Sequence, residues 1–203
     1  MNEVDTRLIA ALRLQLSKRP SNAVRVGWKY GSGDDERIGG EIAVGHLIAE
    51  RTLEDASIYS GGGADLHADV ELAVEIGDNA EIRRYAVALE ICDLADGGGP
   101  EEIVAKNDYH RAVAFGAFAD ERPAHLEGAL FVNGHERAAG VAPTPEEVVA
   151  RVRAVERVLG AVSEELRPGD RVITGLIVNC VVASGDEVTG DLGALGRVRL
   201  YIA

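Results

Sequence analysis

Carboxylates at close spacing mark the segment HADVELAVEIG at residues 67–77 as a place where chemistry is feasible. Its alternation predicts a half-buried strand, with Asp69 and Glu71 on the face opposite the apolar residues Val70, Leu72, Val74 and Ile76. A solvated sheet face would carry such carboxylates without any function. Carboxylates at i and i+2 also lie about 7 Å apart at the backbone, so both can converge on one hard cation.

A third carboxylate stands in the apolar segment RRYAVALEICDL at residues 83–94. Glu90 shares its face with Ala86, Ala88 and Cys92, and a charge there is costly unless it is paired or bound to a cation. The alanines leave room for a cation and its water. With Asp69 and Glu71, Glu90 therefore favours a site for Mg²⁺ or Mn²⁺ over a solvated surface, with positions left open for a chelating substrate.

Other catalytic signatures are missing from the sequence. The glycine clusters at 61–63 and 97–99 lack the Lys-Ser/Thr of a phosphate loop, and there is no G-x-S-x-G nucleophile elbow. The five histidines have no zinc-ligand spacing, and we expect each to be a surface or structural residue. They are His46, His67, His110, His125 and His135.

Composition narrows the class of protein. A net charge of −13 argues against a nucleic-acid partner, and no apolar run approaches the roughly 20 residues of a membrane span. No secretory signal is visible, and Cys92 and Cys180 lie in apolar contexts typical of buried thiols. We therefore expect a single cytoplasmic domain over residues 1–203.

The predicted elements are mostly strands. Residues 1–22 form a helical segment, with a helix over 5–17 capped by Asp5. A longer helix starts at a capping box in residues 143–166, and Asn133-Gly134 predicts a hairpin. Few helices and no regular βαβ alternation argue against a Rossmann fold or a TIM barrel. Further strands are expected at 23–31, 172–182, 187–192 and 197–202.

Eight segments match, in order, the pattern of one known family from about residue 24 to the C-terminus. They are VGWKYG, AVGHL, DVELAVEIG, ALEICDL, KNDYHRAVAFG, VNGHERAAGVA, PGDRVITG and GDEVTGDLGALGRVRLYI. DVELAVEIG resembles the metal strand E-P-E-L-A-F-V-L-G, and ALEICDL resembles A-x-E-I-V-D. The chain thus resembles the fumarylacetoacetate hydrolase superfamily, in its 2-keto-4-pentenoate hydratase and 4-oxalocrotonate decarboxylase branch.

The resemblance implies a predominantly β, α+β fold: a mixed β-roll or sandwich with one long helix and a reduced N-terminal helical region. It places Asp69, Glu71 and Glu90 at the three metal-ligand positions, for Mg²⁺ or Mn²⁺. Lys29 takes the place of the active-site lysine, although by itself it reads equally as an outward-pointing lysine at a strand end. Substrate contacts are expected from Ser32, His46, Asn107 and Thr174.

The implied function is a magnesium-dependent hydratase, a lyase acting on a small 2-hydroxydienoic or 2-oxo acid through a metal-stabilised enolate. Decarboxylation and C–C hydrolysis share that enolate and remain alternatives, and a dimer or larger homo-oligomer is implied. Residues 107–109 lack the branch's Ala-Ser, and LIVNC at 176–180 lacks its prolines. A non-catalytic member that binds a metal or a partner is the rival interpretation.

Overall fold

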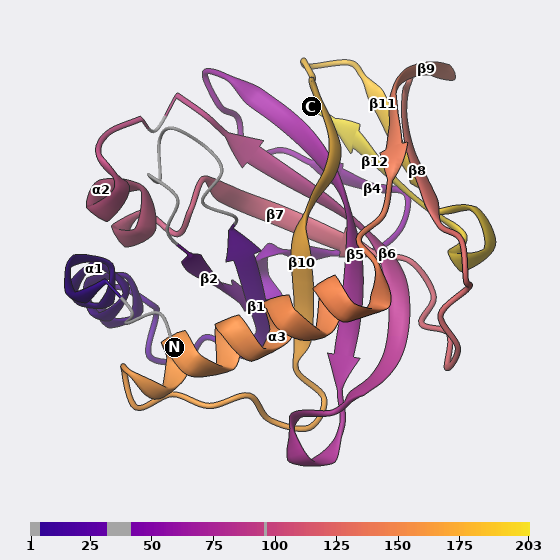
Figure 1. Cartoon of the computed structure of the whole chain (residues 1–203). Helices are drawn as coiled ribbons and strands as arrows, with labels where there is room; N and C mark the ends of the chain where they lie inside the picture. Colours follow the sequence, from indigo (N-terminus) through magenta and orange to yellow (C-terminus); the bar gives the residue numbers. More distant parts are fainter. Residues whose placement is uncertain (1–4, 32–41, 96) are drawn as a thin grey trace.

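The computed structural model describes residues 5–31, 42–95 and 97–203, and its strands form two sheets (Figure 1). The larger has the order β2-β1-β10-β5-β6-β7-β3, and the smaller has the order β4-β12-β11-β8-β9. The larger sheet contains β1 (Arg25–Gly31), β2 (Ala43–Ile48), β3 (Thr52–Leu53), β5 (Leu66–Ile76), β6 (Ile82–Asp93), β7 (His110–Phe115) and β10 (Arg171–Val181). The smaller contains β4 (Ser57–Tyr59), β8 (Glu127–Val132), β9 (His135–Val141), β11 (Glu187–Asp191) and β12 (Arg197–Ile202).

The two longer helices begin at the caps that the sequence predicts. Asp5 accepts a hydrogen bond from the Arg7 amide at 2.8 Å, and Thr144 and Glu147 form the reciprocal capping box. No described helix is long and apolar enough to cross a membrane. The α-helices are α1 (Thr6–Ser17), α2 (Pro100–Ala105) and α3 (Pro145–Gly160), and the 3₁₀ segments are η1 (Ala49–Arg51), η2 (Asp78–Ala80) and η3 (Gly193–Leu195).

The two edge strands of the larger sheet, β2 and β3, are joined only by η1. The four Cα–Cα steps from Ile48 to Thr52 span at most about 14 Å. The edges of a flat seven-stranded sheet would lie roughly 29 Å apart. The sheet must therefore curl until its edges approach each other. Lys29 of β1 and Glu90 of β6 are separated by β10 and β5, yet their charged atoms lie 3.0 Å apart. Their side chains must therefore meet inside the curl.

The two faces of the curled sheet have different neighbours. Its outer face carries Val70, Leu72 and Val74, which join one large core with residues of α1, α3 and the smaller sheet. Its inner face carries a separate, smaller apolar cluster built largely from small and β-branched residues. That inner cluster consists of Leu47, Ala73, Ala86, Ala88, Val113 and Ile173.

Several expectations from the sequence are confirmed. The protein is α+β and predominantly strand, and β8 and β9 form a hairpin with Asn133 and Gly134 in its turn at φ 53° and 76°. Both cysteines are free, although only Cys92 is fully buried. The helix predicted over 5–17 is α1, which runs from Thr6 to Ser17, and β1 begins at Arg25; residues 1–4 of the predicted N-terminal segment lie outside the described residues.

Gly27 is required where β1 and β10 run in parallel. A Cβ at this position would lie 1.8 Å from the Arg171 carbonyl oxygen, in a pairing of three registered residues. We predict that Gly27→Ala lowers the free energy of unfolding by at least about 3 kcal/mol, measured by urea denaturation. Gly97→Ala is the control, because no atom lies within 4 Å of its added Cβ. A Gly27→Ala protein as stable as the parent would contradict this account.

Candidate metal centre

The three predicted carboxylates lie together on the inner face of the curled sheet. Asp69 of β5 stands directly opposite Glu90 of β6, and Glu71 stands opposite Ala88. Glu71 and Glu90 are 1% and 0% exposed, so neither is a solvated surface residue. The solvated-face reading of the HADVELAVEIG segment is therefore wrong for Glu71, and the alternation serves both the core and the carboxylate cluster.

Lys29 reaches the same cluster from β1. Its Nζ lies 3.0 Å from Glu90 Oε2, donates to the Asp108 carbonyl at 2.9 Å and lies 3.6 Å from Cys92 Sγ. The side chain is buried, so the outward-pointing interpretation is excluded. The carboxylate cluster and Lys29 thus share one chamber inside the sheet.

A strained segment holds the lysine in place. Asn107, Asp108 and Tyr109 are consecutive non-glycine residues with φ of 71°, 51° and 62°, a conformation that costs energy at each residue. The Asn107 amide accepts from the His46 N–H at 2.8 Å and donates to the His46 carbonyl at 3.1 Å. It therefore pairs with the backbone of edge strand β2 as a neighbouring strand would. This pairing presents the Asp108 carbonyl to Lys29.

His110 and Cys92 are site residues that sequence reasoning missed. His110 is 1% exposed and its Nδ1 lies 2.7 Å from Glu90 Oε1, so it is not a surface residue. Cys92 Sγ lies 3.6 Å from Asp69 Oδ2. The alternation placed Cys92 on the face of Glu90, which was a usable signal. His110 had none, because a bulge in the β6–β7 pairing brings it opposite Cys92.

Burial sets the protonation of the metal-free cluster. Burial and the Glu90 charge raise the pKa of Asp69 to about 7 and raise the pKa of Glu71 well above its ordinary value. Burial alone would also raise the pKa of Glu90, but Lys29 and His110 outweigh it and lower this pKa to about 2. Glu90 is therefore the ionised member, and it needs the cation beside it.

The pKa values of the groups around Glu90 shift in opposite directions. Burial lowers the pKa of Lys29, but its acidic neighbours Cys92, Glu90 and Asp108 outweigh this effect and hold the pKa well above its ordinary value. Burial raises the pKa of the Cys92 thiol, and Glu90 adds to this effect. Burial also lowers the pKa of His110 despite its bond to Glu90. The metal-free site thus places the Lys29 ammonium 3.0 Å from the Glu90 carboxylate and 3.8 Å from the Asp108 carboxylate, and it keeps the imidazole neutral.

The residues present fit a divalent cation. Oxygen and sulfur atoms of Asp69, Glu90 and Cys92 lie within 4.8 Å of one another. Asp69 Oδ1 is buried and has no hydrogen-bond partner among the described residues, as expected of an oxygen that faces a cation. Glu71 is not in this trio, and its Oε2 accepts from the Gly175 amide at 2.7 Å. Carboxylate oxygens suit Mg²⁺ and Mn²⁺, whereas the Cys92 sulfur is a softer donor.

Comparisons with known proteins place this geometry in a fold family. No family model and no curated protein matches the chain. The 4-oxalocrotonate decarboxylase from Pseudomonas putida G7, complexed with magnesium and adipate, has a TM-score of 0.82 at 19% identity, covering 96% of this chain and 86% of that chain.

Two further structures agree over most of both chains. Fumarylpyruvate hydrolase from Pseudomonas aeruginosa, in complex with Mn²⁺ and pyruvate, has a TM-score of 0.65 at 19% identity, covering 89% of this chain and 90% of that chain. A protein from Yersinia pestis CO92, whose name places it in the fumarylacetoacetate hydrolase family, has a TM-score of 0.63 at 21% identity, covering 90% and 94%. The chain has the fumarylacetoacetate hydrolase fold.

Within this fumarylacetoacetate hydrolase fold, the described residues that we expect to contact substrate form hydrogen bonds with other parts of the protein, and their contacts with substrate stay predictions. His46 Nδ1 contacts Gln15 Oε1 at 3.0 Å, and the amide of Asn107 is engaged by the His46 backbone. The Thr174 hydroxyl donates to the Leu72 carbonyl at 2.8 Å. Ser32 lies outside the described residues. In this structure His46, Asn107 and Thr174 support neighbouring elements.

The raised pKa of Asp69 predicts a pH-dependent stability for the metal-free protein. Folding raises this pKa from 3.8 to about 7, so ionisation of Asp69 destabilises the folded state as pH rises through that window. Asp69→Asn removes this titration. The free energy of unfolding of the variant minus that of the parent should therefore increase between about pH 4 and 7 and stay constant above pH 7. Urea unfolding of metal-free protein at several pH values measures the difference.

Asp78→Asn, at an exposed position of η2, is the matched control and should show no such window. A gap between parent and Asp69→Asn that stays constant from pH 4 to 8 would disprove the assigned titration.

Proposed function

We propose that the chain belongs to the fumarylacetoacetate hydrolase superfamily and is a Mg²⁺- or Mn²⁺-dependent enzyme acting on a small 2-oxo or 2-hydroxydienoic acid. The observation that carries the proposal is the carboxylate cluster of half-buried Asp69 with buried Glu71 and Glu90, and Lys29 at 3.0 Å from Glu90. Solved structures with this fold hold magnesium with adipate and Mn²⁺ with pyruvate, which supports both the cation and the acid.

Asp69 and Glu90 would hold the cation, with Glu71 and Cys92 beside them. Bound there, a cation would supply Lewis acidity toward a chelating 2-oxo acid. The carboxylates must lose the protons that the metal-free cluster retains, so cation affinity should rise with pH.

Lys29 would contribute positive charge. Because its pKa is held well above the ordinary value, the ammonium keeps its proton and is unsuited to proton abstraction. It can stabilise negative charge on the acid or donate a proton. His110 would position Glu90, because its imidazole holds Oε1 at 2.7 Å while Oε2 faces Lys29 at 3.0 Å.

The chamber wall also favours this chemistry. Ala73, Ala86 and Ala88 lie on the face that carries the carboxylates, and Leu47, Val113 and Ile173 complete an apolar cluster that is fully buried. An apolar wall excludes water and strengthens each electrostatic interaction inside the chamber.

Among reactions that pass through an enolate, decarboxylation has the strongest support. The decarboxylase structure agrees at a TM-score of 0.82, against 0.65 for the fumarylpyruvate hydrolase. The hydratase activity that the sequence favoured remains a second candidate from the same branch. A cytoplasmic location and a homo-oligomer remain predictions.

Cation binding is the first test. We predict that Asp69→Asn weakens Mn²⁺ binding by about tenfold or more in calorimetric titration, because it removes an anionic donor from the trio. Glu127→Gln removes a carboxylate at the exposed start of β8 and should bind as the parent does. Equal affinity in the parent and Asp69→Asn would remove Asp69 from the ligand set.

Catalysis is tested by deuterium exchange at C3 of 2-oxo acids, followed by proton NMR with saturating Mg²⁺. The parent should catalyse exchange, and Lys29→Met should slow it by about 10²-fold, because a charge beside the developing enolate is lost. Mn²⁺ affinity of Lys29→Met, measured in parallel, should equal or exceed that of the parent, since a competing ammonium is gone. Folding of the variant is checked by circular dichroism.

Exchange that is as fast in Lys29→Met as in the parent would remove Lys29 from the mechanism. If the parent binds the cation but catalyses no exchange across 2-oxo acids of several lengths, the proposed enzyme activity is wrong. The non-catalytic, metal-binding alternative would then replace it.

A further inference from the structure

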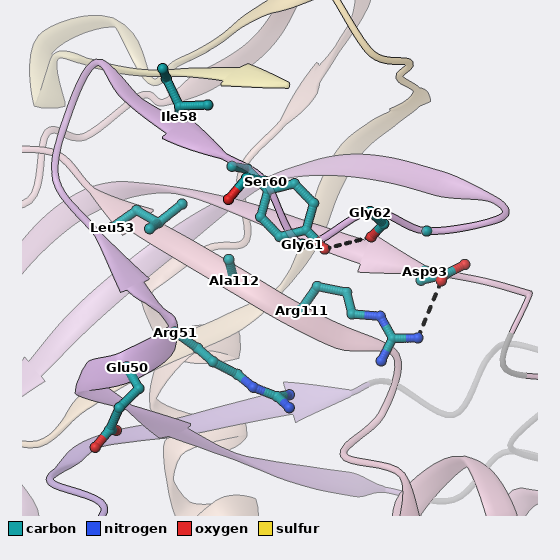
Figure 2. Close-up of a pocket in the computed structure, with 12 residues that line it drawn as sticks. Glu50, Arg51, Leu53, Ile58, Ser60, Gly61, Gly62, Asp93, Arg111 and Ala112 are labelled. Atoms are coloured by element: carbon teal, nitrogen blue, oxygen red, sulfur yellow. Dashed lines mark hydrogen bonds and ion pairs between the residues drawn. The ribbon is translucent and has the colours of Figure 1, made fainter. Parts of the chain in front are cut away.

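A cavity of about 660 Å³ lies outside the chamber, between α1, β2, η1 and the end of α2. It adjoins a second cavity of about 510 Å³, with which it shares Glu50, Arg51 and Arg111 (Figure 2). Neither cavity is lined by Lys29 or by the carboxylate cluster. Both are of the size of cavities that hold small organic ligands.

The larger cavity is strongly basic in a strongly acidic chain. Its lining contains five of the chain's 21 lysines and arginines, although the net charge is −13. Glu50 is the one carboxylate among the described residues that line it. Such a concentration of cations makes the local electrostatic potential more positive and attracts anions, which the acidic remainder of the chain repels. The five cations are Lys18, Arg19, Arg51, Lys106 and Arg111.

Carboxylates outside this cavity already pair with three of these cations. Arg19 lies 3.6 Å from Glu164, Lys106 lies 2.9 Å from Glu102, and Arg111 lies 3.2 Å from Asp93. Lys18 and Arg51 have no carboxylate partner among the described residues. Among the residues that the structure describes, no carboxylate therefore pairs with Arg51 at the junction of the two cavities.

Arg51 and Arg111 are arranged as a pair. They come from η1 and β7, and in Figure 2 their side chains extend in the same direction, while Glu50 directs its carboxylate away from both. Arg51 donates to the His110 carbonyl at 3.1 Å, and Asp93 holds Arg111. A guanidinium has five N–H donors, so these bonds leave Arg51 able to receive an anion.

The pKa of His46, on the wall of the larger cavity, responds to the cations of that cavity. Burial, His110 and then the cations Arg19 and Arg51 lower the pKa of His46 to about 4. The His46 ring is therefore neutral near pH 7, so it adds no charge to the five cations of the cavity.

We propose that this basic cavity binds a small organic molecule carrying two or more anionic groups, phosphoryl or carboxylate, between Arg51 and Arg111. Two guanidinium groups match such an anion through paired N–H donors. Lys18 adds charge from the end of α1. The described lining of this cavity contains neither Lys29 nor the carboxylate cluster, although it includes His46 and Asn107, which the sequence placed among the substrate contacts. The test below needs no cation and no activity, so its outcome is distinct from that of the proposed function.

Calorimetric titration of the full, metal-free chain tests the site with two probes, pyrophosphate and tricarballylate. At least one should bind at a 1:1 ratio, and the tighter probe assigns the natural ligand to phosphoryl or carboxylate chemistry. Arg51→Met should weaken binding by about tenfold or more, the scale of a charge-assisted hydrogen bond. Arg153→Met, at an exposed position of α3, is the matched control and should bind as the parent does.

Two further variants keep the test decisive if Arg51→Met folds poorly. Lys18→Met alters a residue at the C-cap of α1 and should also weaken binding, and Arg51→Lys should retain part of the affinity. The proposal is overturned if neither probe binds at millimolar concentration. It is equally overturned if Lys18→Met and Arg153→Met have the same effect, because attraction to any surface cation would then explain the binding.

Discussion

The three-residue connection between β2 and β3 is the constraint on which the structure depends. Because η1 joins the two edges of a seven-stranded sheet, the sheet has to curl, and one of its faces becomes an interior. The outer face can then be covered by α1, α3 and the smaller sheet, as for any ordinary core. The inner face is left to small apolar residues and to charge, so the centre of the molecule holds polar chemistry between apolar walls.

Charge inside such a chamber must be balanced locally. Removing one partner from a buried ion pair costs about 3–5 kcal/mol, so Lys29 and Glu90 depend on each other in the metal-free state. In the part of the chain that the structure describes, Asp69 and Glu71 form no ion pair, and burial and the Glu90 charge raise their pKa values so that they retain protons. When its carboxylates are ionised, the site carries more negative charge than the Lys29 ammonium alone can balance. A divalent cation would balance this charge more fully, and the strained segment at 107–109 holds the lysine ready meanwhile.

The sequence predicted what alternation and local caps determine. Period two in residues 67–77 and 83–94 placed Asp69, Glu71 and Glu90 on one face, and the caps Asp5 and Thr144 placed both long helices. It could not predict contacts that depend on how the sheet closes. His110 reaches Glu90 only through a bulge, and the Asn107 amide serves the edge of β2. Nor could the sequence predict the partners of His46 and Thr174, which are distant in sequence, and the substrate contacts expected of both residues stay predictions.

Strand β5 has one face in the large apolar core and the other in the charged chamber, and this difference fixes its register in the sheet. A slip of one residue against β6 would drive Asp69 and Glu71 into the large apolar core and turn Val70 and Leu72 toward the charged chamber. Such a slip costs several buried charges as well as lost apolar burial, so misaligned forms are far higher in energy than the native one. The same residues that suit the chain to hold a cation therefore also guard against mispairing while the chain folds.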